Sequence, residues 1–318
     1  MHTLLKLLED GAFHSGEDLG LALGVSRSAV WKKLQQAQTE LGIEIYKVRG
    51  RGYRLAAPLS LLDGEMLSRG HAGLGWTCRI HETIDSTNAE AMRVANSGAD
   101  LPALVLAEQQ TAGRGRRGRL WVSPFAENLY YSLGLRMDGG TRRLDGLSLL
   151  VGLAVVDTLR ELGINSAGLK WPNDILVGHK KLAGVLIEVT GDPANVCHVV
   201  IGIGININMR ASANVDQAWT SLALELGHVQ DRNKVACALS QNLRAYLAGH
   251  QEKGFAAYRQ EWEEKHLWQG LAVALATGAK TTLGIVRGVG DDGSLRLEVD
   301  GRDEHFSGGE VSLRLQGK

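Results

Sequence analysis

A short segment rich in glycine and arginine is the best candidate in the sequence for chemistry with an anion. Residues 113–119 read Gly-Arg-Gly-Arg-Arg-Gly-Arg, and Leu120 and Trp121 follow. Neighbouring Cα atoms lie about 3.8 Å apart, so the separations between the guanidinium groups are close to one Debye length, roughly 8 Å. At such separations the four groups repel one another. An anion would neutralise this repulsion and accept charged hydrogen bonds of about 1.5–3 kcal/mol each. The segment predicts a mobile loop that closes over an anionic ligand, although arginines beside a tryptophan also suit a nucleic-acid-binding patch.

The context of this loop excludes several other functions. Gly113, Gly115 and Gly118 have the spacing of a dinucleotide-binding fingerprint, but that fingerprint must open a helix, and here residues 121–124 lead into a strand-like run. The sequence also lacks the Gly-x4-Gly-Lys-Ser/Thr pattern of a P-loop, so ATP would have to be bound in another way. No Ser-His-Asp or Cys-His triad stands out, which argues against a hydrolase with a side-chain nucleophile.

Two lysine-containing segments are the next candidates. Lys170-Trp171-Pro172-Asn173-Asp174 precedes a predicted strand, and Lys181 follows it, so the two lysines are expected to converge on one site. The alternatives are that Asn173 and Asp174 are only turn residues and that Lys181 is a solvated lysine at the start of a strand. The segment 201–206 places glycines inside another strand, which indicates close approach by a ligand or another backbone, or else tight sheet packing.

The elements that must position these residues follow from the hydrophobic pattern. Between Gly64 and Trp268 the period switches repeatedly, which predicts a mixed α/β or α+β domain. We expect strands at residues 104–107, 129–133, 175–177, 185–187 and 199–207, and helices at residues 87–95, 147–162 and 235–247. From Gly270 the chain turns to short strands separated by turns, at residues 272–276, 281–289, 295–299 and 311–315. These predict a small all-β unit such as an SH3-like barrel.

The first 57 residues predict a winged helix-turn-helix. A short helix is expected at residues 3–8, Ser15 and Ser26 suit the N-caps of two further helices, and residues 43–55 read as a hairpin with a glycine-rich tip. Residues 26–55 carry seven basic against two acidic residues, a net charge of +5, whereas residues 1–25 carry one against four, a net charge of −3. The positive charge thus falls on the expected recognition helix and wing, where phosphates would be met. A three-helix packing module with a basic surface is the alternative.

Length and composition agree with a multidomain globular protein. The chain has 318 residues, 44% of them hydrophobic, and 35 basic residues balance 35 acidic ones. At roughly 100–200 residues per domain, two or three domains are expected. No run approaches the roughly 20 apolar residues of a membrane span, and the N-terminus lacks the features of a secretion signal. Cys78, Cys197 and Cys237 lie far apart with no metal-ligand spacing, which suits a cytoplasmic protein.

Five motifs in order give the sequence a resemblance to a known family. They are Asp85-Ser86-Thr87-Asn88, the 113–119 loop with Trp121, Lys170-Trp171-Pro172-Asn173-Asp174, Lys181-Leu182-Ala183-Gly184 and Gly202-Ile203-Gly204-Ile205-Asn206. Over essentially its whole length the sequence resembles the bifunctional biotin protein ligases and biotin operon repressors. The resemblance implies a multidomain α+β protein with a winged helix-turn-helix at residues 1–57, a linker at 58–65, a catalytic domain at 66–268 and an SH3-like barrel at 269–318. The catalytic domain would be similar to class II aminoacyl-tRNA synthetase cores.

The resemblance also implies a two-step reaction and the residues that serve it. Biotin and ATP with Mg²⁺ give biotinyl-5′-AMP, and biotin then passes to a lysine of the biotin carboxyl carrier protein of acetyl-CoA carboxylase. Arg116 and Lys181 would be catalytic, and biotin would contact Ser86, Thr87, Asn88, Gln110, Arg114, Gly115, Arg116 and Lys181. The nucleotide would lie near Arg119, Trp121, Lys170, Asn173, Asp174, Asn206 and Arg314. No residue is assigned as a metal ligand. Leu120 departs from the pattern, since relatives can carry a basic residue there.

The implied partners include nucleic acid. Biotinyl-AMP would promote a homodimer that binds operator DNA and represses the biotin-synthesis genes. The DNA contacts would come from Ser26, Arg27, Ser28, Trp31, Lys32, Lys33, Arg49 and Arg51. A ligand-sensing repressor without enzymatic activity and a lipoate ligase on a similar catalytic fold are the alternatives. Release of pyrophosphate and competition between biotin and lipoate would separate them.

Overall fold

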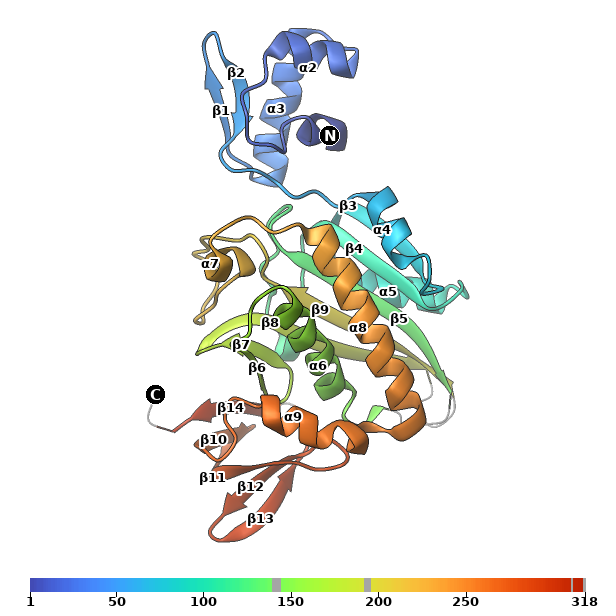
Figure 1. The fold of residues 1–318 in the computed structure, drawn as a ribbon, viewed down its shortest axis with the longest axis vertical. Coiled ribbons are helices and arrows are strands. Elements are labelled where there is room, and N and C mark those ends of the chain that lie inside the picture. The colour runs from blue at the N-terminus through green and yellow to red at the C-terminus, as the bar shows by residue number, and fades with distance from the viewer. Residues whose placement is uncertain (139–143, 192–195, 310, 317–318) are drawn as a thin grey trace.

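The chain forms three successive units, which the computed structural model describes at residues 1–138, 144–191, 196–309 and 311–316 (Figure 1). A small N-terminal unit lies at one end of the molecule, a large α/β unit lies in the middle and a β-sheet lies at the other end. No helix in the described part of the chain is both long enough and apolar enough to cross a membrane.

The N-terminal unit contains a helix-turn-helix followed by a hairpin. Its elements are α1 (His2–Lys6), α2 (Gly16–Leu23), α3 (Arg27–Leu41), β1 (Ile45–Val48) and β2 (Gly52–Leu55). The predicted caps are confirmed, since the hydroxyls of Ser15 and Ser26 accept hydrogen bonds from the backbone of Asp18 and Ala29. A Cβ on Gly20 would lie 2.7 Å from the carbonyl oxygen of Val25, so the tight turn between α2 and α3 requires glycine.

A seven-stranded mixed sheet forms the middle unit, with strand order β3-β4-β5-β9-β8-β7-β6. Among the strand pairs formed by the described residues of this sheet, β3–β4 alone is parallel. The strands are β3 (Thr77–Ile84), β4 (Ala103–Gln110), β5 (Leu129–Asp138), β6 (Ala167–Lys170), β7 (Asp174–Val177), β8 (Lys180–Gly191) and β9 (Val196–Ile205). The helical segments are α4 (Gly64–His71), α5 (Thr87–Asn96), η1 (Arg116–Gly118), α6 (Leu147–Glu161), α7 (Leu222–Leu226), α8 (Arg232–Lys253), η3 (Phe255–Tyr258) and α9 (Arg259–Lys265).

Side chains that alternate along the strands give this sheet two apolar faces, and helices cover both of them. Leu104 and Leu106 of β4 belong to the main core, together with apolar residues of α6 and α8. Val105 points to the opposite face, where it packs with Ala91 of α5 and with Val200 of β9. The face that α5 covers is the one on which the candidate site lies, because even-numbered residues of β9 point there.

The C-terminal unit is a five-stranded antiparallel sheet with strand order β13-β12-β11-β10-β14. Its strands are β10 (Ala272–Thr277), β11 (Lys280–Val289), β12 (Leu295–Val299), β13 (Arg302–Phe306) and β14 (Val311–Leu315). Within the described residues no ladder joins β13 to β14, so the structure supports an antiparallel sheet and leaves the predicted closed barrel without direct support.

The structure differs from the sequence-based expectations in two respects. The strands β3, β6 and β13 and the helices α4 and α9 were not expected, since they are short or largely polar. Of residues 58–65, predicted to be a linker, the last two already belong to α4. The preceding residues run against the middle unit, and the backbone of Ser60, Leu62 and Asp63 is hydrogen-bonded to side chains of that unit.

Candidate functional site

A cavity of about 440 Å³ lies over β8 and β9 and brings most of the candidate residues together. Fourteen of the residues predicted to bind biotin or nucleotide line it: Ser86, Thr87, Asn88, Gln110, Arg114, Gly115, Arg116, Arg119, Trp121, Lys170, Asn173, Asp174, Lys181 and Asn206. Arg314 is exposed on β14 and is not among the lining residues, although its neighbours Val311, Ser312 and Leu313 are.

Three glycines make room for this cavity on the face of the sheet. Gly184 of β8 lies directly opposite Gly204 of β9 in the ladder. A Cβ on Gly204 would lie 2.4 Å from the ring of Trp121, and a Cβ on Gly202 would lie 2.2 Å from Oδ1 of Asn88. The sequence left open a ligand, another backbone or tight sheet packing at these glycines. In the structure, the side chains of Asn88 and Trp121 approach Gly202 and Gly204 closely.

The N-terminus of α5 forms a polar wall of the cavity. Ser86 caps the helix, and both the backbone N–H and the hydroxyl of Thr87 donate to Oε1 of Gln110, at 2.8 and 3.1 Å. Ser132 of β5 donates to Oδ1 of Asn88 at 2.6 Å. These bonds fix the amide and hydroxyl groups before a ligand arrives, which lowers the cost of binding a polar molecule.

A carboxylate bridges the two conspicuous lysines. Oδ1 of Asp174 lies 2.6 Å from Nζ of Lys181, and Oδ2 lies 3.7 Å from Nζ of Lys170. The Lys181 side chain is only 16% exposed, as expected for a partly buried cation. Burial lowers the pKa of Lys170, and the charge of Asp174 acts in the opposite direction. The predicted convergence of the two lysines is present in the structure.

Residues 113–119, the arginine loop, cover the cavity and are held in place by several contacts. Arg114 forms an ion pair with Glu188 of β8 at 3.1 Å. Arg116 donates to Oδ1 of Asn173 at 2.9 Å and to the carbonyl oxygens of Gly308 and Gly309 in the C-terminal unit. Burial lowers the pKa of Arg116. The loop thus lies between the middle and C-terminal units.

Trp121 closes the cavity beside Lys181. Its ring centroid lies 5.4 Å from Nζ of Lys181, within the range of a cation–π contact. Its Nε1 is buried and has no hydrogen-bond partner among the described residues. Leu120, next to it, is 79% exposed, although it is one of the residues that line the cavity.

Sequence reasoning missed part of the cavity wall. The segment from Met209 to Trp219 contributes Asn214, Val215, Asp216 and Gln217. It is anchored where the backbone N–H of Lys181 donates to the carbonyl of Ala218 and that of Thr220 donates to the carbonyl of Lys181. In the sequence, the only feature that could have marked this segment as part of the site was Trp219, at the end of an otherwise polar and irregular stretch.

No metal centre is evident among the described residues, where no group of three or more His, Cys, Asp or Glu side chains is placed to hold an ion. Among the residues that the structure describes, two carboxylates line the cavity, those of Asp174 and Asp216. A Mg²⁺ ion is commonly bound through one or two carboxylates and the phosphates of a nucleotide. These two residues fit a metal that arrives with ATP.

The residues predicted to contact DNA lie in the N-terminal unit, apart from this cavity. Ser26, Arg27, Ser28, Trp31, Lys32, Lys33, Arg49 and Arg51 are all exposed, on α3 or at the tip of the β1–β2 hairpin. Lys47 lies near the rings of Trp31 and Tyr53, at 6.0 and 5.9 Å from their centroids. The helix and the hairpin therefore present one basic surface that includes the exposed Trp31, whereas Tyr53 is buried beneath it.

Comparisons with known proteins agree with this arrangement. Residues 77–206 match the model of the biotin/lipoate A/B protein ligase family, residues 1–54 match an HTH domain and residues 270–314 match the biotin protein ligase C-terminal domain. The chain is 40% identical to the bifunctional ligase/repressor BirA of Escherichia coli over 98% of its own length and 96% of that protein. It is 34% identical to the BirA of Bacillus subtilis over 91% of its length and 90% of that protein. A biotin protein ligase from Aquifex aeolicus, solved with biotin and ATP, superposes with a TM-score of 0.67 at 30% identity and covers 76% of this chain and 99% of that one.

Proposed function

The chain belongs to the family of bifunctional biotin protein ligases and repressors, and on this premise we propose how its residues divide the work. It is a biotin protein ligase that uses biotin, ATP and Mg²⁺, and its N-terminal unit is that of a DNA-binding repressor. The observation that carries the assignment of the site is the Asp174 bridge between Lys170 and Lys181, inside the cavity that the arginine loop covers.

Biotin occupies the part of the cavity next to α5. Ser86, Thr87, Asn88 and Gln110 offer hydroxyl and amide groups there, and Arg114, Gly115, Arg116 and Lys181 surround the carboxylate end. This placement is supported by the hydrogen bonds that already order Thr87 and Gln110.

The nucleotide occupies the part of the cavity toward β7 and the C-terminal unit. Trp121 covers the adenine, and the charged and amide groups of Arg119, Lys170, Asn173, Asp174 and Asn206 face the ribose and phosphates. The side chain of Asn206 is tied to the carbonyl of Thr220 at 3.0 Å, so it is a fixed part of the wall. We also assign Arg314 to this end of the cavity, through movement of β14.

The chemistry requires positioning and charge stabilisation only. A biotin carboxylate oxygen attacks the α-phosphorus of ATP, the bond to the β-phosphate breaks, and pyrophosphate leaves with that electron pair. The acceptor lysine, as a free amine, then attacks the anhydride carbonyl, AMP departs, and the amine loses a proton. Lys181 and Arg116 stabilise the negative charge that develops on oxygen, and Asp174 keeps Lys181 in place. Asp174 and Asp216 would hold a Mg²⁺ ion that arrives with ATP, and the ion would neutralise part of the charge of the phosphates.

We propose further that three macromolecular partners use this chain. The acceptor is the biotin carboxyl carrier protein of acetyl-CoA carboxylase, the DNA is an operator of biotin-synthesis genes, and a second copy of the chain joins when biotinyl-AMP is bound. We place the protein in the cytoplasm, with domains at 1–57, 66–268 and 269–318. The middle unit is similar to class II synthetase cores, and the last unit is an SH3-like barrel.

Biotin-dependent release of pyrophosphate tests the assignment of Lys181. Lys181→Ala removes a cation from the reacting phosphate, and we expect kcat to fall about 10²- to 10³-fold. Lys180→Ala is the matched control, because Lys180 is the adjacent lysine and is exposed. It should release pyrophosphate at the wild-type rate.

Two outcomes would contradict this proposal. A wild-type protein that releases no pyrophosphate when biotin is added is no ligase, and a Lys181→Ala variant with unchanged kcat shows that Lys181 is not catalytic. Lipoate added in excess should leave the biotin reaction unchanged. Strong competition would favour a lipoate ligase.

A further inference from the structure

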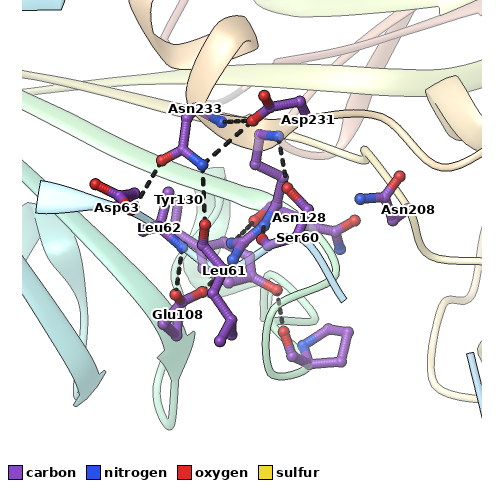
Figure 2. Close-up of polar contacts among 12 residues, drawn as sticks. Ser60, Leu61, Leu62, Asp63, Glu108, Asn128, Tyr130, Asn208, Asp231 and Asn233 are labelled. Carbon is purple, nitrogen blue, oxygen red and sulfur yellow. Dashed lines mark hydrogen bonds and ion pairs between the residues drawn. The ribbon is translucent and has the colours of Figure 1, made fainter. Parts of the chain in front are cut away.

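The segment that joins the DNA-binding unit to the middle unit is pinned along its backbone by buried side chains (Figure 2). The backbone N–H of Leu62 donates to Oε1 of Glu108 at 2.6 Å. Nε of Arg232 donates to the carbonyl oxygen of Ser60, also at 2.6 Å, and the Arg232 N–H donates to the Ser60 hydroxyl at 2.9 Å. Each partner comes from a regular element, since Glu108 lies in β4 and Arg232 begins α8.

The next residue of α8 completes the contact. Nδ2 of Asn233 donates to the carbonyl oxygen of Leu61 at 2.9 Å, and its Oδ1 accepts from the backbone N–H of Asp63 at 2.8 Å. Four consecutive residues, 60–63, are therefore bonded to side chains of the middle unit. On the other side, the N–H of Leu59 donates to the carbonyl oxygen of Glu9 in the DNA-binding unit.

At the centre of this contact is an ion pair between Arg232 and Glu108. The two side chains are 0% and 2% exposed. Burying two charges is costly unless both find partners, and breaking such a pair from one side leaves an uncompensated charge. Here the pair is satisfied through the linker backbone and through the carbonyl oxygen of Asn128, which accepts from Nη1 of Arg232 at 2.9 Å. The ligase chemistry makes no use of this pair.

The contact around the Arg232–Glu108 pair is also linked to the arginine loop through the chain. Phe125 follows Trp121 by four residues and packs, with Ala126 and Leu61, into the hydrophobic core of the DNA-binding unit. The N–H of Ala126 donates to the carbonyl oxygen of Glu108, so this segment and the linker share one support. Asn128 connects to the far side of the cavity, because its Oδ1 accepts from the N–H of Ile207, next to Asn206.

We propose that the Arg232–Glu108 pair and Phe125 form a rigid junction that holds the DNA-binding unit at a fixed position and transmits ordering of the arginine loop to it. This regulatory role rests on the proposed function of the chain as a ligand-dependent repressor. Removing the junction should release the DNA-binding unit from ligand control while ligation continues.

The double variant Arg232→Met/Glu108→Gln tests the junction without leaving a lone buried charge. Three readouts are compared: chymotrypsin cleavage after Leu59, Leu61 and Leu62, biotin-dependent pyrophosphate release, and gel shift of DNA from upstream of the biotin-synthesis genes with and without biotin and ATP. We expect cleavage to be at least about tenfold faster, which corresponds to about 1.4 kcal/mol of local stability. Pyrophosphate release should stay within about twofold of wild type, and DNA affinity should no longer rise with biotin and ATP.

Two further variants make the result specific. Arg287→Met/Glu298→Gln removes an exposed pair of the same type from the C-terminal sheet and should change none of the readouts. Phe125→Ala weakens the other half of the junction and should also abolish the effect of biotin and ATP on DNA binding.

Unchanged cleavage and an unchanged ligand effect in the double variant would overturn the proposal. Loss of pyrophosphate release in the double variant would also overturn it, since the pair would then only support the catalytic fold. A wild-type protein whose DNA binding ignores biotin and ATP would instead refute the repressor part of the proposed function. The cleavage rates would still decide whether the pair fixes the linker.

Discussion

Asp174 is the residue on which the geometry of the site depends most. It pairs with Lys181 at 2.6 Å and lies 3.7 Å from Lys170, so one carboxylate orients two cations. Without it the two ammonium groups would repel each other in a partly buried cavity, where charges are screened less than in water. The sequence indicated that the lysines converge, because they flank a short strand. Asp174, the carboxylate that pairs with both lysines, was one of the two residues that could equally have been only turn residues.

His266 provides a residue-scale prediction of pH dependence. Its ring stacks on Trp262 with 4.6 Å between centroids, and burial lowers its pKa to about 4, against a smaller opposite effect of Gln269. The folded state therefore prefers the neutral ring, and this contribution to stability is complete above pH 6.5 and is lost as the pH falls toward 4. His266→Phe keeps a stacked ring that cannot be protonated. Relative to wild type, the variant should gain about 2–3 kcal/mol in the free energy of unfolding between pH 7 and pH 4.5, measured by urea denaturation.

The exposed residue His2 serves as the control for this experiment, since His2→Gln should follow the wild-type profile. If the difference in the free energy of unfolding between wild type and His266→Phe stays constant with pH, His266 does not take up a proton on unfolding.

At the scale of elements, α3 and the β1–β2 hairpin predict how DNA binding responds to salt. Arg49 is exposed at the hairpin tip, where a phosphate contact would release counterions. Arg49→Ala should weaken binding to DNA of any sequence by a similar factor and reduce the slope of log K against log[salt] by about 1. Lys280→Ala removes a similar charge from the start of β11, whose sheet lies at the opposite end of the molecule (Figure 1), and should leave the slope unchanged. Equal slopes for wild type and Arg49→Ala would remove Arg49 from the interface.

Elements with a strong local signal were predictable from the sequence. The caps at Ser15 and Ser26 and the apolar period of residues 147–162 depend on neighbouring residues, and the structure has helices there. The polar edge strand β3 and the short β13 lack a periodic apolar pattern, so only pairing with their neighbours defines them.

The site was predictable to a different extent. The motifs that line the cavity were all visible, but the wall from Met209 to Trp219 was not, because it is positioned by backbone bonds to Lys181. The buried Arg232–Glu108 pair was also invisible, since its members are 124 residues apart. Long-range polar pairs leave no periodic trace in a sequence.

At the scale of the whole molecule, a net charge of zero conceals separate charged surfaces. Residues 26–55 carry a net charge of +5, and the arginine loop adds a second positive cluster within a nearly balanced remainder. These clusters lie in different units, and the buried junction at residues 60–63 connects them. Neutrality therefore excludes a generally basic protein while allowing two local anion sites.

The largest-scale prediction concerns association of two copies of the chain. Biotinyl-AMP would neutralise the arginine loop and add to the contacts that already hold it, and a dimer that forms only with the ligand-bound loop should gain about 1–3 kcal/mol, or about 5- to 150-fold in the association constant. Sedimentation velocity at increasing protein concentration, with and without biotin and ATP, measures this shift. The Lys181→Ala variant should sediment with both substrates as the wild-type protein does without them, because it forms little adenylate. If wild type sediments as the same monomer with and without both substrates while it still releases pyrophosphate, adenylate formation is not coupled to dimerisation.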